Sequence, residues 1–145
     1  MHIAIGSDHA GFNLKQTVMS LLCEMGHGYK DFGCHDTGAV DYPDIGKPVA
    51  EAVSQGEFDC GILICSTGVG MSIVANKVSG IRAALCQDMF SARRAREHNN
   101  ANILCLGEGV IGQGLARDIV TTYLTSEFIG GRHAHRVEKI QALDA

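Results

Sequence analysis

The sequence lacks an excess of positive charge. Its 145 residues include 12 Lys and Arg against 16 Asp and Glu, which gives a formal net charge of −4. Proteins that bind nucleic acid or anionic membranes by bulk electrostatics present a basic surface instead. The one arginine-rich stretch, residues 91–98, has no aromatic side chains between its arginines on which RNA bases would stack. We therefore expect no nucleic acid and no membrane as partner, and we interpret Arg93, Arg94 and Arg96 as a solvated basic face.

Long apolar runs and leader-like segments are also missing. No run approaches the roughly 20 residues that a membrane helix needs. The first apolar residues have no basic segment before them, so we expect no secretory signal. The content of 46% hydrophobic and 19% charged residues is typical of a globular protein. Linkers, repeats and low-complexity tracts are absent, so residues 1–145 are expected to form a single domain.

Paired cysteine motifs are absent although the chain has six cysteines. None of them forms a CxxC pair, so free thiols in a reducing cytoplasm are expected rather than a disulfide framework. The segments Cys34-His35 and His133-Ala134-His135 lack a second pair at zinc-site spacing. No Walker motif or GxGxxG fingerprint occurs, and residues 107–112 match a dinucleotide loop only weakly. The sequence thus predicts neither a metal nor a cofactor.

Strand-like and helix-like segments alternate along the chain. Short apolar runs predict strands at residues 2–6, 28–33, 61–64, 81–86 and 102–106. Helical spacing of apolar residues predicts helices at 14–25, 45–55, 71–77, 91–98, 112–124 and 132–143. This alternation is typical of an α/β protein with a parallel sheet that is covered on both faces.

Residues 62–71, Ile-Leu-Ile-Cys-Ser-Thr-Gly-Val-Gly-Met, are the most informative stretch. A buried strand that runs through a glycine-containing turn into a helix gathers backbone N–H groups at the helix's positive end, where they can hold an anion. Cys65 would lie at the carboxyl end of this strand, where open α/β sheets bind ligands, and the helix end favours its thiolate. The stretch indicates a base beside an anion hole. The alternative is one more buried cysteine and a turn that merely needs glycine.

Three further segments carry residues suited to chemistry. Asp8-His9 follows the first strand and could move protons, although Asp8 is also suited to capping the next helix. Arg132 and Arg136 are four residues apart, so on a helix they would face the same way and clamp a phosphate, or else form a solvated face. His98 ends a helix, where it would act as a catalyst or as a charge partner of the helix terminus.

Taken together, these residues resemble the ribose-5-phosphate isomerase B family, which also contains the galactose-6-phosphate isomerase subunits. The matching segments follow the family order and cover nearly the whole chain: residues 6–11, 41–43, 62–70, 76–77, 80–83, 97–99, 130–133 and 136–137. Their combination is highly specific, although no single segment is. The resemblance implies a three-layer, Rossmann-like doubly wound fold with a five-stranded parallel sheet and helices on both faces.

The resemblance also implies an aldose–ketose isomerase that uses no metal or cofactor. Cys65 would be the base that moves a proton between carbons one and two of a sugar phosphate, and Asp8 would handle protons on the substrate oxygens. His98 would open the sugar ring together with Thr67. The expected substrate-binding residues are His9, Tyr42, Ser66, Gly68, Val69, Gly70, Asn99, Arg132 and Arg136, with the backbone of residues 67–70 as the anion hole.

In this family the active site is shared, so the resemblance implies a homodimer, or a tetramer, in which His98 and Asn99 reach the neighbour's site. Two positions depart from the family pattern. Many members carry an arginine near position 109, where this chain has Gly109, and Ser66 stands where the family usually has glycine. The expected reaction interconverts ribose 5-phosphate and ribulose 5-phosphate. The alternatives are isomerisation of galactose 6-phosphate or allose 6-phosphate, and a non-catalytic flavodoxin-like module that binds a phosphorylated ligand.

Overall fold

The computed structural model describes residues 1–144 and contains one five-stranded parallel sheet. The strands lie in the order β2-β1-β3-β5-β4, with β3 in the centre. Their bounds are β1 (His2–Ser7), β2 (Gly28–Asp31), β3 (Cys60–Cys65), β4 (Ala83–Leu85) and β5 (Ile103–Gly107). Register places Ser7 beside Ile64 and Cys65 beside Gly107, so β1, β3 and β5 end at the same edge. The predicted α/β class and the parallel five-stranded sheet are confirmed.

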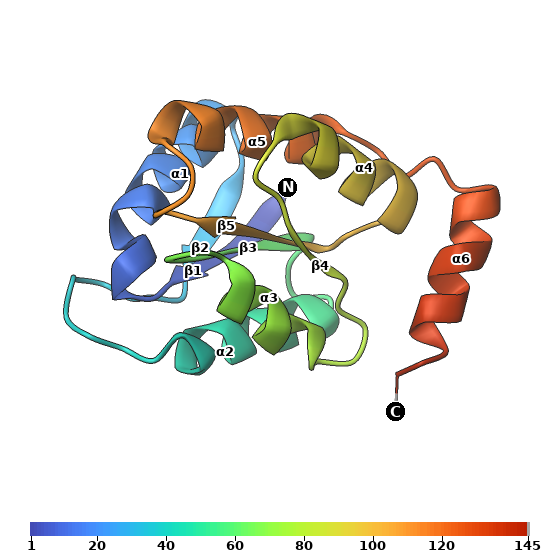
Figure 1. The fold of residues 1–145 in the computed structure, drawn as a ribbon, viewed down its shortest axis with the longest axis horizontal. Coiled ribbons are helices and arrows are strands. Elements are labelled where there is room, and N and C mark those ends of the chain that lie inside the picture. Colours follow the sequence, from blue (N-terminus) through green and yellow to red (C-terminus); the bar gives the residue numbers. More distant parts are fainter. Residues whose placement is uncertain (145) are drawn as a thin grey trace.

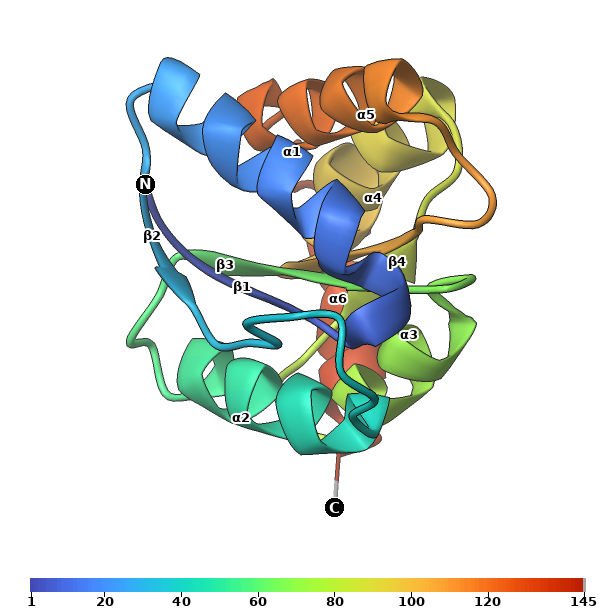
Figure 2. The ribbon, with the colours of Figure 1, turned by 90° about the vertical axis from the view of Figure 1, so that its left-hand side faces the viewer.

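Helices cover both faces of the sheet, as Figures 1 and 2 show. The helices are η1 (His9–Gly11), α1 (Phe12–Glu24), α2 (Tyr42–Ser54), α3 (Val69–Asn76), α4 (Met89–Asn99), α5 (Gln113–Thr125) and α6 (Arg132–Gln141). Helices α1, α4 and α5 lie on one face, and α2 and α3 lie on the other. Helix α6 stands apart at one end of the molecule and packs on α4. No helix within residues 1–144 is long and apolar enough to cross a membrane.

Two apolar clusters, one on each face, hold the layers together. One cluster joins β1, β3 and β5 to α1, α4 and α5, and the other joins the sheet to α2 and α3. All six residues of β3 are buried. Because a central parallel strand has helices on both faces, it needs apolar side chains on both, and the continuous run Gly61 to Ile64 meets this requirement.

Some element boundaries differ from the prediction. Helix α2 begins at Tyr42 rather than residue 45, because Pro43 fits the first helical turn, where no backbone N–H is needed. Strand β4 spans only Ala83–Leu85, whereas residues 81–86 were expected. This edge strand is closed off by Asn76, whose side chain accepts from Ala83 N at 2.8 Å and donates to Ala83 O at 3.0 Å. One side chain thus takes the place of a further strand at that point.

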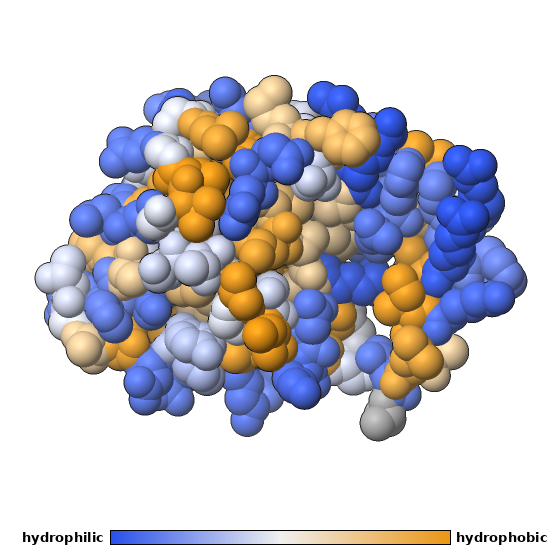
Figure 3. Space-filling model, in the orientation of Figure 1, coloured by the Kyte–Doolittle hydropathy of each residue, from blue (hydrophilic) through white to orange (hydrophobic). Residues whose placement is uncertain are grey.

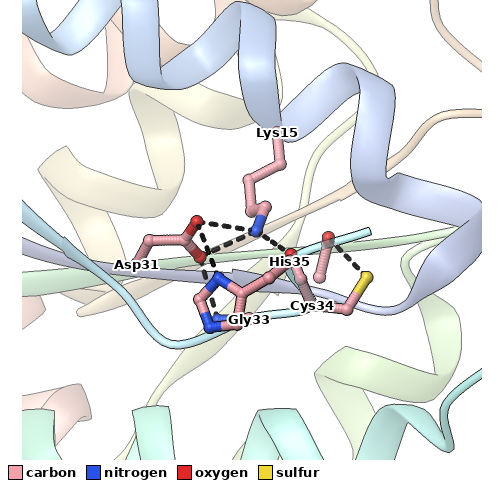
Figure 4. Close-up of polar contacts among 6 residues, drawn as sticks. Lys15, Asp31, Gly33, Cys34 and His35 are labelled. Atoms are coloured by element: carbon pink, nitrogen blue, oxygen red, sulfur yellow. Dashed lines mark hydrogen bonds and ion pairs between the residues drawn. The ribbon is translucent and has the colours of Figure 1, made fainter. Parts of the chain in front are cut away.

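A buried ion pair fixes the segment between β2 and α2. Lys15 of α1 is fully buried, and its Nζ lies 2.7 Å and 2.9 Å from the two carboxylate oxygens of Asp31 (Figure 4). The same Nζ donates to the Cys34 carbonyl, while Asp31 accepts from Gly33 N at 2.9 Å. These contacts direct the chain from the sheet edge toward Tyr42.

Candidate active site

Cys65 ends β3 at the carboxyl edge of the sheet and is 5% exposed. The N–H of Gly68 donates to its sulfur at 3.2 Å, a contact that stabilises negative charge on sulfur. Gly68 reaches this position with φ +79°, and a Cβ there would lie 2.5 Å from Leu85 Cδ1. Glycine is therefore required at residue 68 for both conformation and space. The expected strand, turn and helix arrangement is confirmed here.

The backbone amides of this loop have different partners. The N–H of Gly68 points at the thiol, and Val69 N donates to Thr67 Oγ1 at 3.2 Å. Gly70 and Met71 lie in the first turn of α3, where N–H groups have no acceptor within the helix. Donors suited to an anion therefore lie next to Cys65. Of the four amides expected to form the hole, those of residues 68 and 69 already have partners within the loop.

The segment after β5 supports the Cys65 loop. Glu108 N donates to Cys65 O and Gly109 N donates to Ser66 O, both at 2.9 Å. A Cβ at Gly107 would lie 2.6 Å from the Thr67 backbone. Residues 107–109 therefore hold the loop rather than forming a dinucleotide site. The two departures from the family pattern, Ser66 and Gly109, are bonded to each other, which the sequence alone did not indicate.

Asp8 and His9 lie beside the same edge. Asp8 is 7% exposed, its N–H donates to Ile64 O at 3.3 Å, and its Oδ1 accepts from Gly11 N at 3.1 Å. Asp8 thus caps the short helix η1 rather than α1, whose N-cap is Gly11. Its backbone bond to Ile64 holds it next to the residue that precedes Cys65. His9 Nδ1 accepts from Val40 N at 3.2 Å, so the neutral ring carries its proton on Nε2. His9 also lines a cavity of about 420 Å³.

Tyr42 lies at the start of α2 and packs against the Cys65 loop. A Cβ added to Gly70 would lie 2.7 Å from two carbon atoms of the Tyr42 ring. Glycine at residue 70 therefore leaves room for the aromatic side chain. Asp8, His9, Tyr42 and residues 65–70 form one group, which we call the thiol half-site.

The remaining expected residues form a second group around α4 and α6. His98 stacks on His133, with ring centroids 4.0 Å apart and planes 9° from parallel. Both rings line a cavity of about 500 Å³ together with Arg94 and Arg132. Burial lowers the pKa of His133, and the positive neighbours His98, Arg132, Arg136 and Arg94 lower it further. We call His98, Asn99, Arg132 and Arg136 the imidazole half-site.

Within one chain the two half-sites lie at opposite edges of the sheet, the thiol half-site at the carboxyl edge and the imidazole half-site near the amino edge. Strands β4 and β5 are parallel neighbours, so α4 leaves the carboxyl edge and returns to the amino edge. Its 11 residues rise roughly 16 Å, and His98 and Asn99 are in its last turn. In Figure 1 the start of α1 lies at the left end of the molecule, whereas α6 lies at the right end. The structure does not bring Cys65 and His98 together in one chain.

Other reactive groups are scattered. The six cysteines are free, and Cys23 is the exposed one. Burial raises the pKa of Cys60 to about 12 and that of Cys86 to about 11, and it raises the pKa of Cys105 as well. Within residues 1–144, no three His, Cys, Asp or Glu side chains are grouped as metal ligands would be. His135 is exposed, whereas His133 faces His98.

Comparison with known proteins agrees with the expected family. The Ribose/Galactose Isomerase family model matches residues 3–140. Over 141 residues the chain is 56% identical to "Putative sugar phosphate isomerase YwlF" of Bacillus subtilis (97% of this chain, 95% of the relative). It is 48% identical, also over 141 residues, to D-erythrulose-4-phosphate isomerase of Pectobacterium atrosepticum (97% and 93%). The solved structure of Clostridium thermocellum ribose-5-phosphate isomerase B superposes with TM-score 0.97 at 58% identity, covering 99% and 97% of the two chains. The chain therefore belongs to the ribose/galactose isomerase family of sugar phosphate isomerases.

Proposed function

We propose that this enzyme interconverts D-ribose 5-phosphate and D-ribulose 5-phosphate through an enediolate, in active sites that are shared between two copies of the chain. The observation that carries the chemistry is the Cys65 sulfur, which accepts the Gly68 N–H at 3.2 Å beside the open first turn of α3. The name of the Clostridium thermocellum relative supports ribose 5-phosphate as the substrate.

Each half-site supplies a different step. A cyclic aldose phosphate must first be opened, and His98 with Thr67 would provide the acid and base for this. Cys65 would then remove the weakly acidic proton on carbon two and return it to carbon one. The negative oxygen formed in between is stabilised by fixed N–H donors, and loss of one such donor typically slows a reaction about a hundredfold or more. Asp8 would exchange the protons on the two oxygens.

A second copy of the chain would unite the half-sites. A two-fold dimer buries the same patch on both chains and forms two equal sites. Large exposed apolar side chains occur near both half-sites, among them Val69 and Ile73 on α3 and Ile129 and Ile140 next to or on α6. Figure 3 shows apolar surface over α3 and along the lower part of α6. Covering this surface provides a driving force for dimer formation.

The substrate assignment is tested by assaying sugar phosphates side by side. After treatment with a chelator, the protein should interconvert ribose and ribulose 5-phosphates with a higher kcat/KM than it shows for galactose 6-phosphate, allose 6-phosphate or a tetrose 4-phosphate. The last of these is included because the Pectobacterium atrosepticum relative is an erythrulose 4-phosphate isomerase. A higher kcat/KM for one of the other sugar phosphates would contradict the assignment and identify that sugar phosphate as the preferred substrate.

Replacing Arg132 or Arg136 by alanine should weaken phosphate binding. Both guanidinium groups are exposed on α6 and are free to grip a phosphate brought by a partner subunit. Each loss should reduce the binding of substrate and of inorganic phosphate by about 1.5–3 kcal/mol, the range for a charge-assisted hydrogen bond. Inhibition constants for inorganic phosphate measure the effect. Lys139→Ala, on the same helix, is the control for loss of one positive charge. Unchanged inhibition by phosphate in both arginine variants would mean that Arg132 and Arg136 only form a solvated basic face.

Alkylation should inactivate the enzyme through Cys65 alone. In a Cys23→Ser, Cys34→Ala background the exposed thiol and one of the buried thiols are removed. The raised pKa values of Cys60, Cys86 and Cys105 keep those thiols protonated and slow to react. Iodoacetamide should add one group per chain in step with loss of activity, and ribose 5-phosphate should protect. Peptide mass spectrometry locates the group. Labelling of another thiol, or inactivation at the same rate with and without ribose 5-phosphate, would refute the assignment of Cys65 as the base.

A further inference from the structure

The C-terminal turn of α4 carries His98 and Asn99 and is held from outside the helix by an arginine. The last carbonyls of a helix have no partner within it. Here Arg82 Nε donates to Asn99 O at 3.0 Å and to Asn100 O at 3.2 Å, and Arg82 Nη2 donates to Asn100 O at 2.9 Å. The guanidinium thus bridges two carbonyls directly after His98.

Arg82 is itself held in place. Its N–H donates to Asn102 Oδ1 at 2.8 Å, and Asn102 Nδ2 donates to Gly80 O at 2.9 Å. The next residue, Ala83, begins β4 and pairs with Ile103 of β5. The main chain of Arg82 is therefore fixed at the amino edge of the sheet. Its guanidinium links this edge to the carbonyls at the end of α4 and restrains them.

The end of α4 is a left-handed C-cap, in which several carbonyls accept hydrogen bonds from outside the helix. Asn100 has φ +47°, the only positive φ among the described residues other than glycine. A second arginine, Arg96, donates from Nη1 to Asn100 Oδ1 at 3.0 Å and to Ala101 O at 2.8 Å, so the sequence interpretation of Arg96 as solvated is wrong. Two partly buried guanidinium groups at one turn repel each other, and the carbonyls that accept from them offset this repulsion.

We propose that Arg82 is a positioning residue for isomerisation, which fixes the main chain of the His98-Asn99 turn so that these two side chains meet a substrate bound at the thiol half-site of a partner subunit. The inference rests on the proposed shared site. Arg82 touches no group of the thiol half-site, so its effect is confined to the half-site that its own chain donates.

The test is complementation between variants. Arg82→Met keeps an unbranched, flexible side chain but removes the guanidinium donors. The kcat/KM for ribose 5-phosphate should fall at least about tenfold, since misplacement of a catalytic group by an ångström costs up to about a hundredfold. Arg82→Lys donates from a single point and should recover only part of the loss. Arg93→Met removes an exposed arginine of α4, the helix whose end Arg82 holds, and this control variant should stay near wild type.

Subunit mixing separates positioning from general loss of structure. Arg82→Met mixed with Cys65→Ala should regain about a quarter of wild-type activity, because half the dimers then contain one site with an intact thiol half-site and an intact imidazole half-site. Arg82→Met mixed with His98→Asn should regain nothing, because both lesions lie in the same half-site. Full activity of Arg82→Met alone, or no recovery with Cys65→Ala, would overturn the proposal.

Hydrogen exchange gives an answer that does not depend on mixing. In Arg82→Met, amide exchange should become faster at residues 100–102 and stay unchanged at residues 65–72. Unchanged exchange at residues 100–102 would overturn the role of Arg82 even where mixing succeeds. If Cys65→Ala and His98→Asn fail to complement each other while exchange changes as expected, the shared site is wrong and Arg82 still orders the turn.

Discussion

Cys65→Ala should abolish isomerisation while leaving the fold intact. A positioned general base contributes about a hundredfold to ten-thousandfold to rate, and no other thiol or carboxylate lies in α3 to replace it. Cys65→Ser should also be very slow, because a hydroxyl ionises far less readily than a thiol. Steady-state kinetics with ribose 5-phosphate measures both variants. Turnover of even a tenth of wild type in Cys65→Ala would mean that another group is the base.

Cys60→Ala is the matched control for this substitution. Cys60 begins β3 and Cys65 ends it, both are 5% exposed, and the same atoms are removed in each case. The two variants should lose similar free energy of unfolding, measured by urea titration, because each leaves a small cavity. Only the variant at the carboxyl edge should lose activity. Equal losses of activity would point to a defect in strand packing rather than in catalysis.

His98→Asn should reduce kcat/KM for ribose 5-phosphate at least about a hundredfold, the lower end of general acid–base catalysis. The loss should be confined to substrates that form rings. An aldotetrose 4-phosphate cannot close a five-membered ring, since its C4 oxygen carries the phosphate, so its isomerisation should be nearly unaffected. Side-by-side assays of the two sugars measure the difference. An equal loss on both sugars would contradict a role in ring opening.

The layers and the thiol half-site follow from local patterns. The continuous apolar run before Cys65 predicts a buried central strand, and the glycines after it predict the turn into α3. Gly68 has both a positive φ and no room for a Cβ, so the glycine in the sequence reflects a direct steric requirement. Helical spacing likewise predicts that Arg132 and Arg136 share a helix, and α6 contains both.

Contacts between distant segments were beyond the reach of such patterns. The bonds of Arg82 to the end of α4 and of Gly109 to Ser66 join residues far apart in the sequence, and each depends on the strand order rather than on local spacing. Tyr42 was expected to precede the helix predicted from residue 45, yet α2 begins at Tyr42, whose ring packs against Gly70. The position of His98 relative to Cys65 likewise needed the direction of α4.

The most direct test of the account mixes two inactive variants. Cys65→Ala and His98→Asn are co-refolded, exchange of subunits is verified by mass, and ribose 5-phosphate isomerisation is assayed. In a mixed dimer both lesions fall in one site and the other site is intact, so random exchange should restore about a quarter of wild-type activity. If both residues acted within one chain, every site would carry a lesion. Activity no higher than the mean of the two separate variants would therefore contradict the shared site.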